Sequence, residues 1–119
     1  MAMIYLKSTT LLLLFVLSVS FGFFHHGWAN YDQTKVLDFE TTIDESTFGN
    51  PHTMVTVKYQ NESWEVYLAP ASRMTDRGLT AEMIKKGTKV RIVAYPHKTE
   101  KGEMRAERIY VDDKKYELR

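Results

Sequence analysis

Hydrophobic and polar residues alternate along most of the chain after residue 35. In the segment 35–48 (KVLDFETTIDESTF), Leu37, Phe39 and Ile43 share one face, and acidic residues occupy the other. A period of two is the pattern of a half-buried β-strand. The same alternation predicts further strands at 52–59, 63–69, 88–96 and 105–111. A short edge strand is expected to follow within residues 112–118.

Turn and helix signals separate these segments. Residues 49–51 (GNP) are a turn signal, because Gly and Asn tolerate left-handed backbone and Pro fixes φ. Residues 70–78 and 80–87 each predict a short helix with a glycine at its end, capped by Ser72 and Thr80 respectively. A helix between the third and fourth strands of a closed five-stranded sheet is the plan of the OB-fold.

We therefore predict an all-β domain with a small α insert. It is an OB-like five-stranded antiparallel barrel covering residues 36–119. A generic antiparallel roll is the alternative, because alternation predicts the strands but not how they close.

An apolar leader precedes this domain. Lys7 is followed by the nearly continuous apolar run 9–24, and a basic residue before such a run is typical of a secretory signal peptide. The run is shorter than the about 20 apolar residues that a membrane-spanning helix needs. We expect cleavage after Gly22, with a cut two residues earlier as the alternative. Residues 1–22 would then be signal peptide and 23–35 an N-terminal arm. The mature protein would be periplasmic or secreted, and only an uncleaved leader would contact the membrane.

Charge and cysteine content narrow the function further. Without Lys7, 16 − 1 = 15 basic residues balance 15 acidic ones. Nucleic-acid binding needs a basic face that releases counterions, so no nucleic-acid partner is expected. The chain has no cysteine, which excludes disulfides and thiolate ligands. It also lacks an HExxH motif, a Gly-rich phosphate loop and a nucleophile elbow, so we expect a protein that is not an enzyme.

Several short motifs occur together along the chain. They are HHGW (25–28), FGNPH (48–52), APASRMTDRGLT (69–80), KKGTKVRIVAYPHK (85–98) and GEMRAERI (102–109). Through them the chain resembles a family of small exported bacterial proteins of unknown function, in which a leader is followed by a histidine pair. The resemblance implies a small β-barrel in the periplasm and carries no established activity. The chain departs from the family pattern at Phe23 and Phe24, where an alanine usually precedes the pair.

All four histidines lie beyond the apolar leader. His52 ends the loop after the first predicted strand, and His97 begins the loop after the fourth. We expect these two loops to lie at the same rim of the barrel, where OB-folds bind ligands. His25 and His26 lie in the arm, and extended chain spans up to about 3.3 Å per residue, so the arm can reach that rim.

Two methionines accompany these histidines. Met54 and Met104 flank the same loops, and histidine with methionine is a ligand set that copper accepts. The hypothesis is a metal site for copper first and zinc second. The alternative is structural or partner-binding histidines, with methionines that fill the core.

A separate copper geometry depends on cleavage after Gly22. The new N-terminus FFH (23–25) would then offer an amine, two amides and an imidazole, a square-planar nitrogen set.

A partner of a different class is also compatible with the sequence. The protein would then be a structural or adaptor domain that binds a peptide or an envelope protein through aromatic and arginine side chains. The candidate residues are Trp28, Tyr31, Arg73, Arg77 and Arg105. Guanidinium groups bind carboxylates in a forked geometry, and aromatic rings line grooves. The structural alternative is that the arginines pair with neighbouring acids and the rings cover a small core.

Overall fold

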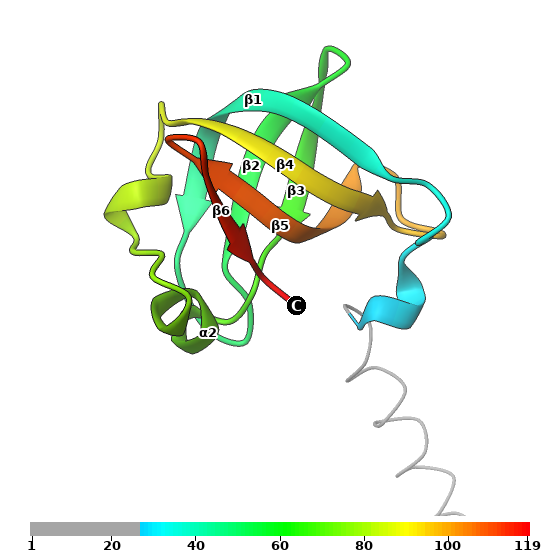
Figure 1. The fold of residues 1–119 in the computed structure, drawn as a ribbon. Helices are drawn as coiled ribbons and strands as arrows, with labels where there is room; N and C mark the ends of the chain where they lie inside the picture. The colour runs from blue at the N-terminus through cyan, green and yellow to red at the C-terminus, as the bar shows by residue number, and fades with distance from the viewer. Residues whose placement is uncertain (1–26) are drawn as a thin grey trace, which may run out of the picture.

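The computed structural model describes residues 27–119, in which one sheet has the strand order β3-β2-β1-β4-β5-β6. The strands are β1 (Leu37–Thr47), β2 (Met54–Tyr59), β3 (Glu62–Tyr67), β4 (Lys89–Pro96), β5 (Glu103–Val111) and β6 (Lys114–Glu117). A parallel pairing between β3 and β5 closes the first five strands into a barrel, and β6 pairs with β5 at its edge (Figure 1). The predicted OB-like five-stranded barrel with a small α insert is confirmed.

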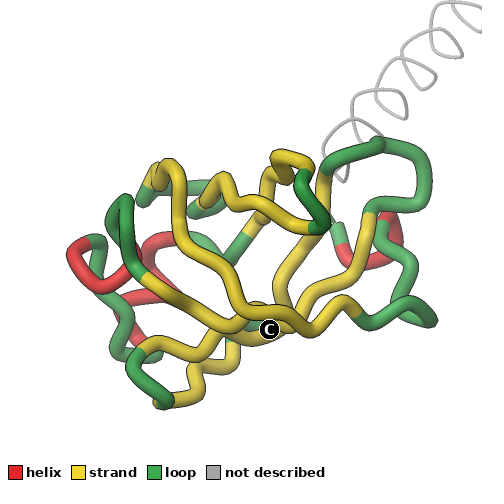
Figure 2. The backbone as a smooth tube through the Cα atoms, turned by 90° about the horizontal axis from the view of Figure 1, so that it is seen from above, coloured by secondary structure: helices red, strands yellow, loops and turns green. Residues whose placement is uncertain are grey.

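The helical segments lie at opposite ends of this barrel, as Figure 2 shows. They are the 3-10 turn η1 (Trp28–Asn30), the helix α2 (Ala71–Asp76) and the 3-10 turn η2 (Glu82–Ile84). Between residues 27 and 119, no helix has the length and apolar character that crossing a membrane requires. The predicted signal peptide, His25 and His26 lie outside the described residues.

Strand β1 pairs with two strands in succession along its length. Its residues 37–42 pair with β4, and the part from Ile43 onward pairs with β2. The predicted inward face is confirmed, since Leu37 and Phe39 are half-buried and Ile43 is buried. The register shifts between Ile43 and Glu45, and such a bulge bends a strand. This bend lets β1 pair first with β4 and then with β2.

The apolar faces predicted from the sequence fill the barrel interior. Val55, Val57, Val66, Ile92 and Ile109 come from four strands, and each is 0% exposed. They belong to one buried cluster. Full burial of such a side chain stabilises the fold by about 1.5–3 kcal/mol. The interior is therefore a packed core, and polar chemistry is confined to the outer face and the loops.

The insert between β3 and β4 differs from the prediction in two details. Ser72 does not cap α2, because the helix begins after Pro70 without a side-chain cap and Ser72 lies inside it. The Thr80 hydroxyl does accept a hydrogen bond from the Met83 N–H at 3.4 Å, but the segment forms only the 3-10 turn η2. Both helices are shorter than expected, because no long apolar stripe is present to hold them.

Gly78 closely follows α2 and lies in the left-handed region, with φ of +92°. We expect Gly78→Ala to lower the free energy of unfolding by about 1–2 kcal/mol, because a Cβ is strained there. The added Cβ would meet the Tyr116 ring only at 3.7 Å, so the cost is conformational. Gly49→Ala is the matched control, with nothing within 4 Å of its Cβ and no left-handed φ. Urea denaturation of both variants measures the difference, and equal stability losses would contradict this interpretation.

Candidate functional site

The loops that carry His52 and His97 lie at opposite ends of β1. Leu37, at the start of β1, pairs with Ala94 near the end of β4, which leads into His97. Thr47, at the end of β1, pairs with Met54, which closely follows His52. The expectation of a shared rim was therefore wrong, because strands that run antiparallel to β1 place these two loops at its two ends.

A short parallel seam between β3 and β5 nevertheless connects the two histidines. Its three pairs are Glu65 with Glu103, Val66 with Met104, and Tyr67 with Arg105. Val66 and Met104 are buried in the core, so alternation turns the other two pairs to the outer face.

Each histidine contacts one side of this outer face. The His52 ring meets the Tyr67 ring edge-on at 6.0 Å between centroids. His97 Nε2 lies 3.7 Å from Glu103 Oε2. The resulting seam cluster consists of Tyr31, His52, Tyr67, His97, Glu103 and Arg105.

Tyr31 brings the N-terminal arm onto this cluster. Its side chain is 1% exposed, and its hydroxyl donates a hydrogen bond to Glu103 Oε2 at 2.8 Å. Its ring packs edge-on against His97 at 5.0 Å. Burial raises the pKa of Tyr31 strongly, and the bond to Glu103 raises this pKa further. Tyr31 is thus a neutral donor that covers a buried carboxylate, and it is not exposed for a partner.

His97 uses one ring nitrogen to hold its own loop. Nδ1 accepts hydrogen bonds from the backbone N–H groups of Thr99 at 3.1 Å and Glu100 at 3.0 Å. A neutral ring therefore carries its proton on Nε2, the nitrogen that faces Glu103. A metal-ligating histidine usually donates from its second nitrogen instead. This geometry gives His97 a structural role and does not favour it as a ligand.

The two methionines have different positions. Met54 is half-buried and pairs with Tyr67, and alternation from the buried Val55 turns it to the outer face. Met104 is 0% exposed within the hydrophobic core. The expectation that Met104 is a metal ligand was wrong, because the apolar side of β5 carries it into the barrel.

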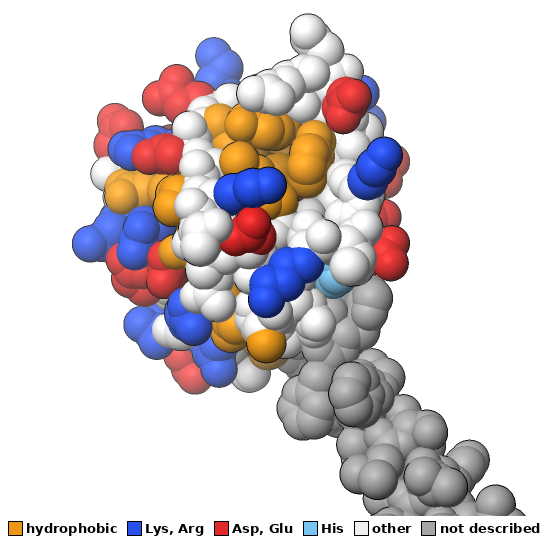
Figure 3. Space-filling view, turned by 90° about the vertical axis from the view of Figure 1, so that its right-hand side faces the viewer, with side chains coloured by type: hydrophobic (Ala, Val, Ile, Leu, Met, Phe, Trp, Pro, Cys, Tyr) orange, Lys and Arg blue, Asp and Glu red, His pale blue; other side chains and the backbone are white. Residues whose placement is uncertain are grey.

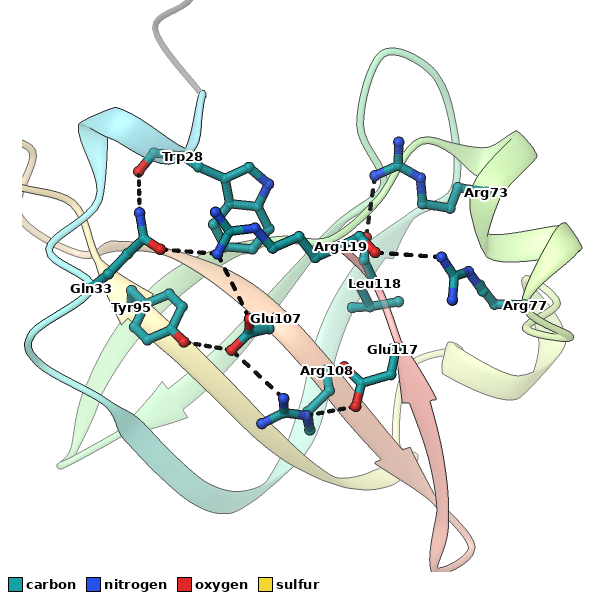
Figure 4. A network of polar contacts seen from close by, with 10 residues as sticks. All are labelled: Trp28, Gln33, Arg73, Arg77, Tyr95, Glu107, Arg108, Glu117, Leu118 and Arg119. Carbon is teal, nitrogen blue, oxygen red and sulfur yellow. Dashed lines mark hydrogen bonds and ion pairs between the residues drawn. The ribbon is translucent and has the colours of Figure 1, made fainter.

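The arginines expected to bind a partner make contacts within the chain, and Figure 4 shows those of Arg73 and Arg77. Arg73 Nη1 donates to the Leu118 carbonyl and Arg77 Nη2 to the Arg119 carbonyl, each at 3.4 Å. The guanidinium carbon of Arg105 lies 4.2 Å from the centre of the Trp28 ring. Burial lowers the pKa of Arg105, and the neighbouring charges of Arg73 and Arg119 act in the same direction. These groups hold the C-terminal segment and the arm in place.

The sequence did not identify Glu103 and Arg119 as residues that help to hold the arm on the barrel. Glu103 begins a strand on its polar face, which by pattern alone predicts an exposed acid, yet it is 8% exposed because the arm covers it. Arg119 lies beyond every motif, and it stacks on Trp28 at 4.4 Å. No local pattern marks either residue, since both depend on segments distant in the sequence.

No group of three or more His, Cys, Asp or Glu side chains within residues 27–119 is placed to hold a metal. His25 and His26 precede that range, so the predicted ligand set extends beyond the described residues. His52 is half-buried. Figure 3 shows one face of the molecule, where charged side chains of both signs lie around an apolar patch.

An open groove elsewhere on the sheet, over β1, β4 and the end of β5, does not include the seam cluster. It has a volume of about 690 Å³ and is lined by polar residues of β1, β4 and β5, among them Glu40, Arg91 and Tyr110. Arg91 is already held by two hydrogen bonds to Asp38, each 2.8 Å long. The candidate site is thus a covered cluster rather than an open cleft.

These features define a class: a small OB-like barrel with a polar cluster beneath an N-terminal arm. The chain belongs to a family of unknown function, DUF6152, whose model matches residues 14–105. The matched range contains all four histidines and the whole arm. A search of curated proteins finds no match.

Proposed function

We propose that the protein is an exported, non-enzymatic binding domain that holds a copper-type metal ion between its arm and the seam cluster. The ligands are His25, His26 and His52, with the Met54 thioether beside them, and zinc is the second choice of metal. The leader directs the chain to the periplasm or the exterior, where residues 1–22 are removed.

The observation that carries this proposal is the docking of Trp28 on Arg105, at 4.2 Å. Arg105 pairs with Tyr67 across the seam, and the Tyr67 ring contacts His52. The arm therefore docks on the β5 side of the seam, and Tyr67, the ring next to His52, lies across the seam from Arg105.

Chain connectivity limits the distance between the histidine pair and the docked Trp28. His26 lies two residues before Trp28 in the sequence. Since consecutive Cα atoms are about 3.8 Å apart, the His26 Cα is at most about 8 Å from that of Trp28. This bound holds for any conformation of the intervening backbone, so it supports a shared site with His52.

The donor types favour copper. Imidazole suits copper and zinc, and a thioether adds preference for Cu(I). The chain has no cysteine to compete for the metal. The pair formed by His97 and Glu103 lies beside the proposed site and supports it: His97 fixes its loop, and Tyr31 and His97 both face the Glu103 carboxylate.

Metal titration tests the proposal directly. The protein is expressed with its own leader and without a histidine tag, and mass spectrometry determines its N-terminus. We expect His52→Ala to lower the Cu(I) affinity by more than about 100-fold, because even outer-sphere partners are worth about 10–100-fold. An N-terminus other than Phe23 removes the square-planar FFH geometry.

His97→Asn is the matched control, because it also removes one imidazole but keeps an acceptor for the Thr99 and Glu100 amides. We expect it to lower the affinity by no more than the about 10–100-fold of an outer-sphere partner, and by less than His52→Ala does. Equal losses in the two variants would contradict the ligand assignment. A wild-type protein that binds neither copper nor zinc would remove the proposed function and favour the adaptor alternative.

A further inference from the structure

β6 (Lys114–Glu117) is the last strand in the order of the sheet, and one of its edges is open. Among the strands of residues 27–119, β5 is the one that pairs with it. We propose that the open edge binds the same edge of a second copy of this chain, so that the two sheets join antiparallel about a two-fold axis at Tyr116. This interface goes beyond the proposed function and does not depend on a metal.

The backbone of β6 offers two residues to such a neighbour. The Leu118 N–H, just beyond the strand, donates to a carbonyl of β5 at 2.9 Å. In an antiparallel ladder, the residues that bond one neighbour alternate with those that face the other side. Tyr116 and Lys114 therefore direct their backbone groups toward β5, and Figure 1 shows these two strands side by side. Lys115 and Glu117 direct theirs to the open edge, where such groups are a template for another strand.

The charges on this edge select one register. Residues that face outward pair with residues that face outward. Lys115 opposite Lys115, or Glu117 opposite Glu117, would bring like charges together, which destabilises a cross-strand pair. Lys115 opposite Glu117 of the second copy gives an opposite-charge pair twice by symmetry, and each pair exchanges two backbone hydrogen bonds. Lysines on an edge strand commonly prevent such pairing, but here Glu117 complements Lys115.

The side chains beside this edge continue the same pattern of charge. Arg108 Nε lies 3.0 Å from Glu117 Oε1, as Figure 4 shows, and Lys115 Nζ lies 3.7 Å from the same oxygen. The Lys115 and Glu117 side chains are 56% and 38% exposed, so both are accessible to a second copy. In the selected register, Asp113 of one copy also comes opposite Arg119 of the other. Acidic and basic groups thus meet along the whole length of the joined strands.

The short edge makes this a weak and reversible dimer. A four-residue strand contributes few hydrogen bonds, and interfaces below about 1,200 Å² are typical of transient contacts. We expect a dissociation constant of about 0.1–1 mM. Salt should weaken the dimer, because the ion pairs lie at the surface and are screened.

Sedimentation velocity at up to about 1 mM protein, near the expected dissociation constant, tests the proposal. The protein is expressed with its own leader and kept with a metal chelator, so the outcome is independent of the proposed function. The variants are Lys115→Glu and Glu117→Lys, studied alone and as an equimolar mixture. Lys114→Glu is the matched control, because it makes the same change of charge on a neighbouring residue that contacts the Tyr116 ring. Circular dichroism checks that each variant is folded.

We expect the wild type to dimerise, and Lys115→Glu or Glu117→Lys alone to weaken the dimer by about tenfold or more, because each places like charges opposite each other twice. Their mixture should recover the wild-type association, since both cross-strand pairs are then opposite in charge again. Lys114→Glu should lower the association by less than about threefold. A wild type that stays monomeric at about 1 mM, or a dimer that Lys115→Glu leaves unchanged, would overturn the proposal. A mixture that associates no better than its two components would overturn the register.

Discussion

Replacing Tyr31 with alanine is expected to lower the free energy of unfolding by about 3–5 kcal/mol, the range for a buried aromatic ring. The Tyr31 side chain is 1% exposed and packs against His97, so its removal leaves a cavity under the arm. It also removes the donor to the buried Glu103 carboxylate. Chemical denaturation measures the loss, and a change below about 0.5 kcal/mol, as for a surface residue, would contradict the described packing.

Tyr31→Phe separates the hydrogen bond from the packing. We expect a loss of about 1–3 kcal/mol, because a buried carboxylate would lose its phenol donor. Tyr95→Phe is the matched control and should cost less, since the Tyr95 hydroxyl donates to Glu107, which also pairs with Arg108 and Arg119. Equal losses of unfolding free energy in Tyr31→Phe and Tyr95→Phe would show that the hydrogen bond to Glu103 contributes no more than the one to Glu107.

The pH dependence of stability gives an independent check on Tyr31. Burial raises its pKa above the ordinary value of 10.0, so the folded state keeps the phenol neutral where the unfolded state ionises it. The contribution of Tyr31 to the free energy of unfolding is therefore full below pH 10.0 and falls as the pH rises above that value. Tyr31→Phe is expected to flatten the stability curve in this alkaline range.

The double replacement His25→Ala/His26→Ala is expected to have the largest effect on the metal. It removes two of the three proposed imidazole ligands, so we expect the Cu(I) affinity to fall by more than about 1,000-fold, well beyond the effect of outer-sphere changes. The stability of the metal-free barrel is expected to stay within about 0.5 kcal/mol of the parent, since the core lies elsewhere.

Competitive titration against a Cu(I) chelator measures this effect, with His97→Asn as the control. Retention of wild-type affinity in the double variant would show that the arm supplies no ligand. A parallel fall in barrel stability would show that the histidine pair has a structural role instead.

The strands and the core were predictable from the sequence because each depends on a local pattern. Alternation in 35–48 and 88–96 identified the inward faces, and the helical insert between the third and fourth strands indicated the OB-like order. The limits of this reasoning appear at 80–87, where a cap and a terminal glycine produced only a 3-10 turn. Caps mark a boundary, but packing decides how long a helix becomes.

The site was less predictable, because its geometry depends on non-local pairing. The parallel seam between β3 and β5 has only three residue pairs, yet it determines that Tyr67 and Arg105 lie together. Met104 was misplaced because β5 begins at Glu103, before the predicted strand 105–111, so Met104 lies within the strand and faces the core. The role of His97 depends on two backbone amides of its own loop, which no spacing in the sequence reveals.

Anomalous diffraction at the copper edge, from crystals of the copper-loaded protein, locates the metal most directly. The account predicts one strong peak within bonding distance of a His52 ring nitrogen, beneath the arm and beside Tyr67. A peak on the outer face of β1 and β4, or a fully loaded protein with no peak near His52, would contradict it.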